Sequence, residues 1–98
     1  MDLELQPSLM ADALGAEAPV RKALAKLIRT IERLGEQEPR SHKGIHLHRI
    51  QKQSDPISGL PLESMELTRS ARVKCMVKGR CLVLLSLHTD HDETYKKR

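Results

Sequence analysis

The spacing of apolar residues predicts an α-helix in the amino-terminal third of the chain and strands in the carboxyl-terminal third. In "EAPVRKALAKLIRTIERLG", residues 17–35, apolar residues recur every three or four positions, as they do on one side of a helix. Pro19 suits the first turn of this helix and Gly35 suits its end. The apolar stripe consists of Val20, Leu24, Leu27, Ile31 and Leu34, widened by Ala23 and Ile28.

Two shorter elements come before this helix. "LELQ" at residues 3–6 alternates apolar and polar residues and so predicts a short strand. "PSLMADALG" predicts a helix of one to two turns, in which Pro7 suits the first turn and Gly15 suits a left-handed C-cap.

The rest of the chain alternates in the manner of strands, separated by polar segments. The predicted strands are "IHLHRI" (45–50), "SMELT" (64–68), "ARVKCMV" (71–77) and "RCLVLLSLH" (80–88). "EQEPRSHKG" (36–44) and "SDPISGLPLE" (54–63) contain proline and glycine and predict loops. The second of these is the best place for an insertion or a mobile loop.

The last two strands predict a hairpin with Lys78 and Gly79 as its two turn residues, so that Val77 faces Arg80. This register places Val73, Cys75, Val77, Leu82 and Leu84 on the face that suits the core. The other face carries Arg72, Lys74, Met76, Cys81, Val83, Leu85 and Leu87. Cys75 and Cys81 then lie on opposite faces, which excludes a disulfide between them unless a bulge shifts the register.

The order of these elements predicts an α+β fold in a single domain, residues 1–98. We expect an antiparallel sheet of about four strands with the two N-terminal helices packed on one of its faces. The other face would be open, and it carries two cations of the hairpin, Arg72 and Lys74. These are a stronger functional lead than the basic side of the long helix, because a run of charges on a helix is usually a solvated surface.

Composition limits the core and the compartment. The chain has 98 residues with no Phe or Trp and one Tyr, so the core must be aliphatic, and a partner or a second copy would add stability. No apolar window is long enough to span a bilayer, and the amino terminus lacks the features of a signal peptide. We therefore expect a cytoplasmic protein that has free thiols and no membrane association.

Charge is distributed unevenly. All 17 Lys and Arg follow residue 19, whereas the first 19 residues contain four acids and no base. The remaining chain thus has a net charge of about +8, which favours a polyanionic partner such as nucleic acid or an acidic protein.

The segment "MELTRSARVKCMVKGRCLVLLSLHTDHDETY", residues 65–95, resembles the end of a RelE/ParE-superfamily toxin. There, a strand leads into a Ser-x-Arg-Val segment, a hairpin, an apolar last strand and a His-Asp-x-x-Tyr ending. "GIHLHRIQKQSDP" is similar to the family's preceding strand and loop. The resemblance implies a toxin that a cognate antitoxin protein holds inactive. The toxin would form a hetero-oligomer with this antitoxin or a homo-oligomer with copies of itself. RelE-like members cleave mRNA on the ribosome, without a cofactor, whereas ParE-like members act on DNA gyrase.

The resemblance also implies roles for individual residues. Arg72 would contact the scissile phosphate with help from Lys74, and His88 or His91 would be the general acid. Tyr95 would stack on a base. Glu66 is the candidate general base, and Arg69 and Arg80 would bind RNA phosphates. The chain departs from many active members because "SMELT" lacks their lysines and because Cys75 and Met76 replace an aromatic residue after the arginine.

Other interpretations of these residues stay open. A ParE-like toxin, or a toxin-fold module that only binds protein, needs no catalytic group. Arg72 and Lys74 could be solvated strand cations, Glu66 could simply pair with one of them, and Tyr95 could cover the core. Zinc binding by His88, Asp90, His91 and Asp92 is disfavoured, since adjacent residues of an extended segment point apart. We therefore expect no metal.

Overall fold

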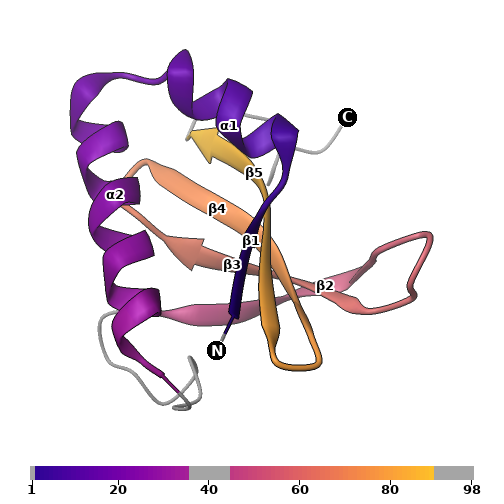
Figure 1. Cartoon of the computed structure of the whole chain (residues 1–98). Helices are drawn as coiled ribbons and strands as arrows, with labels where there is room; N and C mark the ends of the chain where they lie inside the picture. The colour runs from indigo at the N-terminus through magenta and orange to yellow at the C-terminus, as the bar shows by residue number, and fades with distance from the viewer. Residues whose placement is uncertain (1, 36–44, 90–98) are drawn as a thin grey trace, which may run out of the picture.

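The structure is a computed structural model, and it describes residues 2–35 and 45–89. These residues form two helices and five strands (Figure 1). In chain order the elements are β1 (Asp2–Leu5), α1 (Pro7–Leu14), α2 (Ala18–Arg33), β2 (Leu47–Ser54), β3 (Pro61–Glu66), β4 (Ala71–Lys78) and β5 (Cys81–Thr89). No helix among the described residues is long and apolar enough to cross a membrane.

The five strands form one sheet in the order β1-β5-β4-β3-β2. Strands β2 to β5 pair with their neighbours in antiparallel fashion, whereas β1 runs parallel to β5 at the sheet edge. The predicted α+β class is therefore confirmed. The sheet contains both parallel and antiparallel pairs, and it has one strand more than expected. Leu3 and Leu5 of β1 pack against the core, which explains why this short strand joins the sheet.

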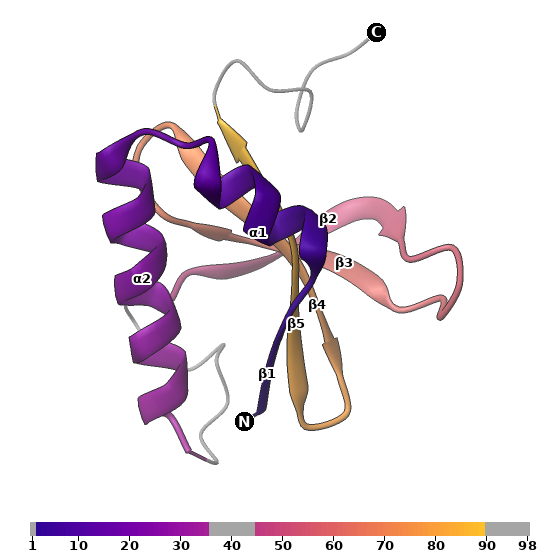
Figure 2. The same cartoon turned by 45° about the horizontal axis from the view of Figure 1, so that its top comes forward.

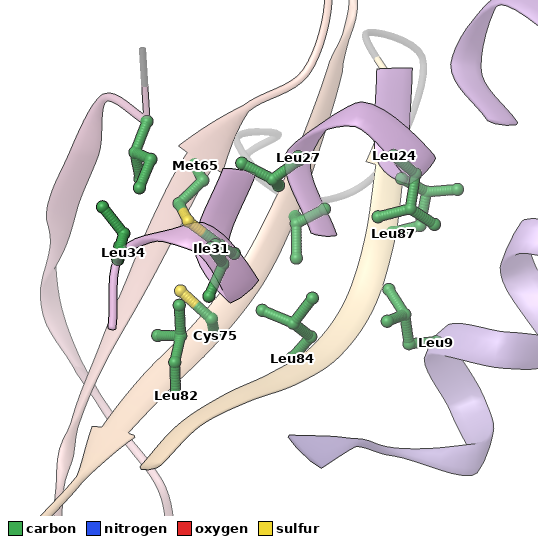
Figure 3. Close-up of a cluster of buried hydrophobic side chains, with 12 residues drawn as sticks. Leu9, Leu24, Leu27, Ile31, Leu34, Met65, Cys75, Leu82, Leu84 and Leu87 are labelled. Atoms are coloured by element: carbon green, nitrogen blue, oxygen red, sulfur yellow. The ribbon is translucent and has the colours of Figure 1, made fainter. Parts of the chain in front are cut away.

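Both helices pack on one face of the sheet, as predicted (Figure 2). The α2 stripe is confirmed, because Leu24, Leu27 and Ile31 are buried there, and α1 contributes Leu9. Figure 3 shows these side chains pointing toward Met65, Cys75 and the leucines of β5. The core is aliphatic and sulfur-containing, and its buried members are Leu9, Leu24, Leu27, Ile31, Leu34, Ile45, Met65, Val73, Cys75, Leu82, Leu84 and Leu87.

The segment predicted as a loop at residues 54–63 is only partly irregular. β2 extends to Ser54 with a break in register after Arg49, and β3 already begins at Pro61. Asp55 organises the turn between them, since its carboxylate accepts hydrogen bonds from the backbone N–H and the hydroxyl of Ser58 at 2.7 and 2.8 Å. These bonds, the backbone one first, lower the pKa of Asp55.

The turn of the β4–β5 hairpin differs from the prediction. Lys78 pairs with Cys81, so the turn residues are Gly79 and Arg80, and Val77 faces Leu82 instead of Arg80. Gly79 has a φ of 62°, and Arg80 has no positive φ. A glycine of positive φ in the first turn position is typical of a type II′ turn, whereas the prediction assumed a type I′ turn with glycine second.

The predicted faces of this hairpin are nevertheless correct as far as Leu84, because the true register differs by an even number of residues. Cys75 is buried in the core, Cys81 is partly exposed on the other face, and both thiols are free, as predicted. Leu87 is an error of the prediction, since it lies in the core and is 8% exposed. Its position results from a bulge in β5, whose consequences are described below.

Gly79 and Gly15 differ in the sign of φ, so replacing each with alanine tests whether the hairpin turn requires a glycine. Gly15 has a φ of −90°, so the predicted left-handed C-cap is wrong, and a Cβ there would lie 3.8 Å from the Asp12 carbonyl oxygen, an ordinary van der Waals contact. We expect Gly79→Ala to lower the free energy of unfolding by about 1–2 kcal/mol, because of its left-handed backbone. Gly15→Ala should be neutral or raise it by about 0.4–1 kcal/mol. Urea unfolding measures both, and equal destabilisation by the two changes would contradict this account of the turn.

Candidate functional site

Three of the predicted site residues lie side by side across the face of the sheet that the helices leave uncovered. Glu66 of β3 is directly opposite Arg72 of β4, and Arg72 is directly opposite His88 of β5. Directly opposed residues of antiparallel strands project from the same face of a sheet. The neighbouring Val73 is fully buried under the helices, so this row projects from the opposite side.

A second row lies next to the first on the same face. Lys74 is opposite Ser64 of β3 and Ser86 of β5, and Ser64 is in turn opposite His48 of β2. We refer to the residues of both rows on β3, β4 and β5 as the open-face cluster; they are Ser64, Glu66, Arg72, Lys74, Ser86 and His88.

Spacing along the chain does not single out His48, Ser64 or Ser86. Alternation along each strand assigns a side chain to a face, but only the pairing of strands shows which side chains are neighbours. Ser86 contacts His88 directly, with 2.7 Å between its Oγ and the imidazole Nε2. Ser64 is 5% exposed, so it is the most buried residue of the cluster.

Glu66 pairs with Arg72, as one of the interpretations of the sequence expected. The Oε2 atom of Glu66 lies 3.7 Å from a guanidinium nitrogen of Arg72, and the two side chains are 47% and 29% exposed. An ion pair this open to solvent contributes about 0–1 kcal/mol to stability. The pair therefore orients Arg72 at little cost, and part of the Arg72 side chain stays exposed to solvent.

A bulge in β5 brings His88 to this face. The register between β4 and β5 shifts after Lys74, because Lys74 pairs with Ser86 while Cys75 pairs with Leu84, and Leu85 is the additional residue. Leu84 and Leu87 both enter the core as a result. The intervening Ser86 and the following His88 consequently project on the side of Arg72.

The uncovered face is not polar over its whole length. Toward the β4–β5 turn, Met76 pairs with Val83, and these residues are 9% and 1% exposed. The hydroxyl of Ser58, from the β2–β3 turn, lies 4.0 Å from the Met76 sulfur. The polar cluster is thus confined to the end of the sheet near the β3–β4 turn.

The remaining predicted residues are placed unequally. Arg69 is exposed in the β3–β4 turn, which Thr68 and Ala71 close through backbone hydrogen bonds, and so it lies at the same end of the sheet as Arg72. Arg80 is exposed at the opposite turn, roughly 20 Å or more from Arg72 at the usual rise of a strand, and is not brought to the cluster. His91 and Tyr95 lie outside the described residues.

Comparisons with known proteins identify the fold. No family model matches the sequence, and no curated protein matches it. Among solved structures, the RelB–RelE antitoxin–toxin complex from Methanococcus jannaschii contains a chain with a TM-score of 0.69 and 8% identity, over 90% of this chain and 91% of that chain. The RelE–RelB complex from Pyrococcus horikoshii gives 0.65 and 13%, over 91% and 93%. The DinJ–YafQ complex from Escherichia coli gives 0.63 and 11%, over 97% and 98%.

The chain has the RelE-like toxin fold. At these identities the likeness concerns the fold and not the side chains. The chemistry of this chain must therefore be inferred from the open-face cluster.

A metal site in the described part of the chain would need several His, Cys, Asp or Glu side chains close together. No three His, Cys, Asp or Glu side chains gather there in a way that could hold an ion. Of the four residues considered for zinc, only His88 is described; Asp90, His91 and Asp92 lie outside the described residues.

Cys81 lies in an environment that disfavours its thiolate. Partial burial raises the pKa of its thiol, and the carboxylates of Glu4 and Asp2 on β1 raise it further, against a smaller opposite effect of Lys78. A raised pKa means less thiolate at a given pH. We therefore expect Cys81, studied in a Cys75→Ala background, to react with iodoacetamide more slowly than a free thiol at about pH 8.5, where an ordinary cysteine is half ionised.

Replacing Asp2 with Asn and Glu4 with Gln should lower the pKa of Cys81 toward its ordinary value and speed alkylation. The pH dependence of the alkylation rate, followed by mass spectrometry, measures this shift. An unchanged profile in the double variant would show that the two carboxylates do not act on the thiol.

Proposed function

We propose that this protein is the toxin of a toxin-antitoxin pair and that it cleaves mRNA on the ribosome. The observation that supports this proposal most strongly is the row of Glu66, Arg72 and His88 on the uncovered face of a RelE-like fold. It supplies a carboxylate, a guanidinium and an imidazole in direct succession across three strands. Lys74 adds a second cation beside the row.

These groups match the needs of RNA cleavage by the ribose 2′-hydroxyl. A base accepts the proton of that hydroxyl as its oxygen attacks the phosphorus, and we assign this step to Glu66. Negative charge grows on the phosphate oxygens, and Arg72 and Lys74 stabilise it. An acid then protonates the departing 5′ oxygen, and we assign this step to the imidazole of His88, the side-chain type that most often serves in proton transfer. The products are a 2′,3′-cyclic phosphate and a 5′-hydroxyl end.

Other residues enter the proposal through the resemblance of the sequence. His91 is the alternative acid, and Tyr95 would stack on a base of the message. Arg69, at the same end of the sheet as the row, would bind an RNA phosphate near the cleavage site. Arg80 lies at the far turn, so any phosphate that it binds is several nucleotides away from the reacting one.

An antitoxin protein is the partner that we propose. The archaeal structures that share the fold are complexes of RelE with RelB. Such a partner would keep the toxin from ribosomes until it is removed. A function on ribosome-bound mRNA also places the protein in the cytoplasm.

Induced expression with and without a candidate antitoxin, followed by mapping of transcript 5′ ends, tests the proposal. Growth arrest with new ends at a fixed position within codons is the expected result, and coexpressed antitoxin should prevent both. Arrest without such ends would overturn the nuclease function. If the arrest came with gyrase-linked DNA breaks, a ParE-like activity would replace it.

A further inference from the structure

The edge of β5 changes partner at the bulge. β1 pairs with β5 only as far as Leu84, whose carbonyl oxygen accepts a hydrogen bond from the backbone N–H of Gln6 at 3.0 Å. The chain then turns into α1, and both Figure 1 and Figure 2 show α1 lying alongside the final part of β5. From Leu85 onward, α1 takes the place of the neighbouring strand.

Two side chains of α1 bind the backbone of the bulge. The Ser8 hydroxyl donates a hydrogen bond to the carbonyl oxygen of Leu85 at 2.6 Å. The backbone N–H of Leu87 donates a hydrogen bond to the Asp12 carboxylate at 3.0 Å. Ser8 and Asp12 are four residues apart, so they project from the same side of the helix. We call these two hydrogen bonds the α1 clamp.

The clamp acts where the bulge determines which way His88 points. Side chains of a regular strand alternate, so Leu84 and His88 would share a face if β5 continued without an additional residue. The bulge at Leu85 reverses this alternation and places His88 opposite Arg72. A bulge at a sheet edge leaves backbone groups without a strand partner, and such groups require another partner to persist.

We infer that Ser8 and Asp12 are positioning residues, which hold the β5 bulge and thereby direct His88 toward Arg72. The clamp orients the imidazole together with Ser86, whose hydroxyl lies 2.7 Å from the ring. The consequence for catalysis rests on the proposed function, whereas the effect on the position of His88 does not. Neither clamp residue touches the substrate; both act through the backbone of β5.

Four variants separate the clamp from general effects on the fold. Asp12→Ala removes the acceptor of the Leu87 N–H, whereas Asp12→Asn keeps a side-chain oxygen that can accept the same bond. Ser8→Ala removes the hydrogen bond to the Leu85 carbonyl oxygen, and it deletes only a neutral hydroxyl where Asp12→Ala deletes a carboxylate. Asp2→Ala is the matched control, because Asp2 is an exposed aspartate beside β5 that pairs with Cys81, before the bulge.

Isotope-labelled protein made by cell-free synthesis provides a readout independent of activity. In Asp12→Ala we expect the Leu87 amide to exchange with solvent at least about tenfold faster. The ring signals of His88 should move toward those of an exposed histidine. Asp12→Asn should restore most of both, Ser8→Ala should shift the ring in the same direction, and Asp2→Ala should change neither. If Asp12→Ala does not fold, the His88 ring signals of Ser8→Ala are compared with those of Asp12→Asn and the wild type.

The rate at which each variant cleaves ribosome-bound mRNA then shows whether the position of His88 affects catalysis. A misplaced acid should lower kcat of Asp12→Ala by about tenfold to a hundredfold with KM nearly unchanged, and Asp12→Asn should recover most of the rate. Unchanged His88 signals in both Asp12→Ala and Ser8→Ala would overturn the clamp, whatever the activity. If the signals move while His88→Gln cleaves as fast as the wild type, the clamp is supported and the catalytic role proposed for His88 is overturned.

Discussion

Replacing Arg72 with alanine is expected to lower the rate of mRNA cleavage by about 10²–10³-fold, the usual effect of removing one preorganised group that stabilises charge in a transition state. Arg72 is the centre of the row, with Glu66 on one side and His88 on the other, and its side chain is 29% exposed. Single-turnover cleavage of ribosome-bound mRNA measures this effect directly.

Two further variants show whether the effect belongs to the position and to the guanidinium. Arg72→Lys keeps a positive charge but cannot contact two phosphate oxygens through a planar fork, so it should recover only part of the rate. Arg80→Ala removes the same group from the far turn and should change the chemical step little. Loss of the ion pair with Glu66 should itself lower the stability of Arg72→Ala by no more than about 1 kcal/mol, because this pair is solvent-exposed. Wild-type cleavage by Arg72→Ala would refute the assignment of the site.

Ile31→Ala should lower the free energy of unfolding by about 2–5 kcal/mol, the range found when a fully buried aliphatic side chain is truncated. Ile31 is 0% exposed and lies where the α2 stripe meets the sheet, near Met65 and Cys75 (Figure 3). The chain has no Phe or Trp, so each aliphatic contact is a larger share of the core. Small domains have about 5–15 kcal/mol of stability, so the variant should be markedly easier to unfold in urea.

The chain contains a matched control for this change. Ile57, in the β2–β3 turn, is 95% exposed, and Ile57→Ala should alter the free energy of unfolding by no more than about 0.5 kcal/mol. Similar losses in the two variants would mean that α2 does not pack on the sheet through Ile31.

The parts of the fold that follow from local periodicity could be predicted from the sequence. The α2 stripe, the faces of β4 and the opposite placement of Cys75 and Cys81 all depend only on spacing along one segment. Strand alternation likewise predicts that Arg72 and Lys74 share a face, and both lie on the face that the helices leave uncovered. The hairpin turn was misplaced because Lys78-Gly79 and Gly79-Arg80 both offer glycine to a two-residue turn.

The features that could not be predicted depend on residues far apart in the chain. β1 is parallel to β5, and the pairing of Leu3 with Leu82 cannot be recognised from the sequence of either segment alone. The bulge at Leu85 depends on Ser8 and Asp12, which precede it by more than 70 residues. Strand alternation alone would therefore have placed His88 on the wrong face.

We propose that the open-face cluster cleaves RNA through the ribose 2′-hydroxyl. The most direct measurement is the chemical nature of the ends produced when the purified protein acts on mRNA in reconstituted ribosomes. We predict 2′,3′-cyclic phosphate and 5′-hydroxyl ends with the wild type, and their near-complete loss with Arg72→Ala. Intact mRNA, or products with 5′-phosphate ends, would contradict the account.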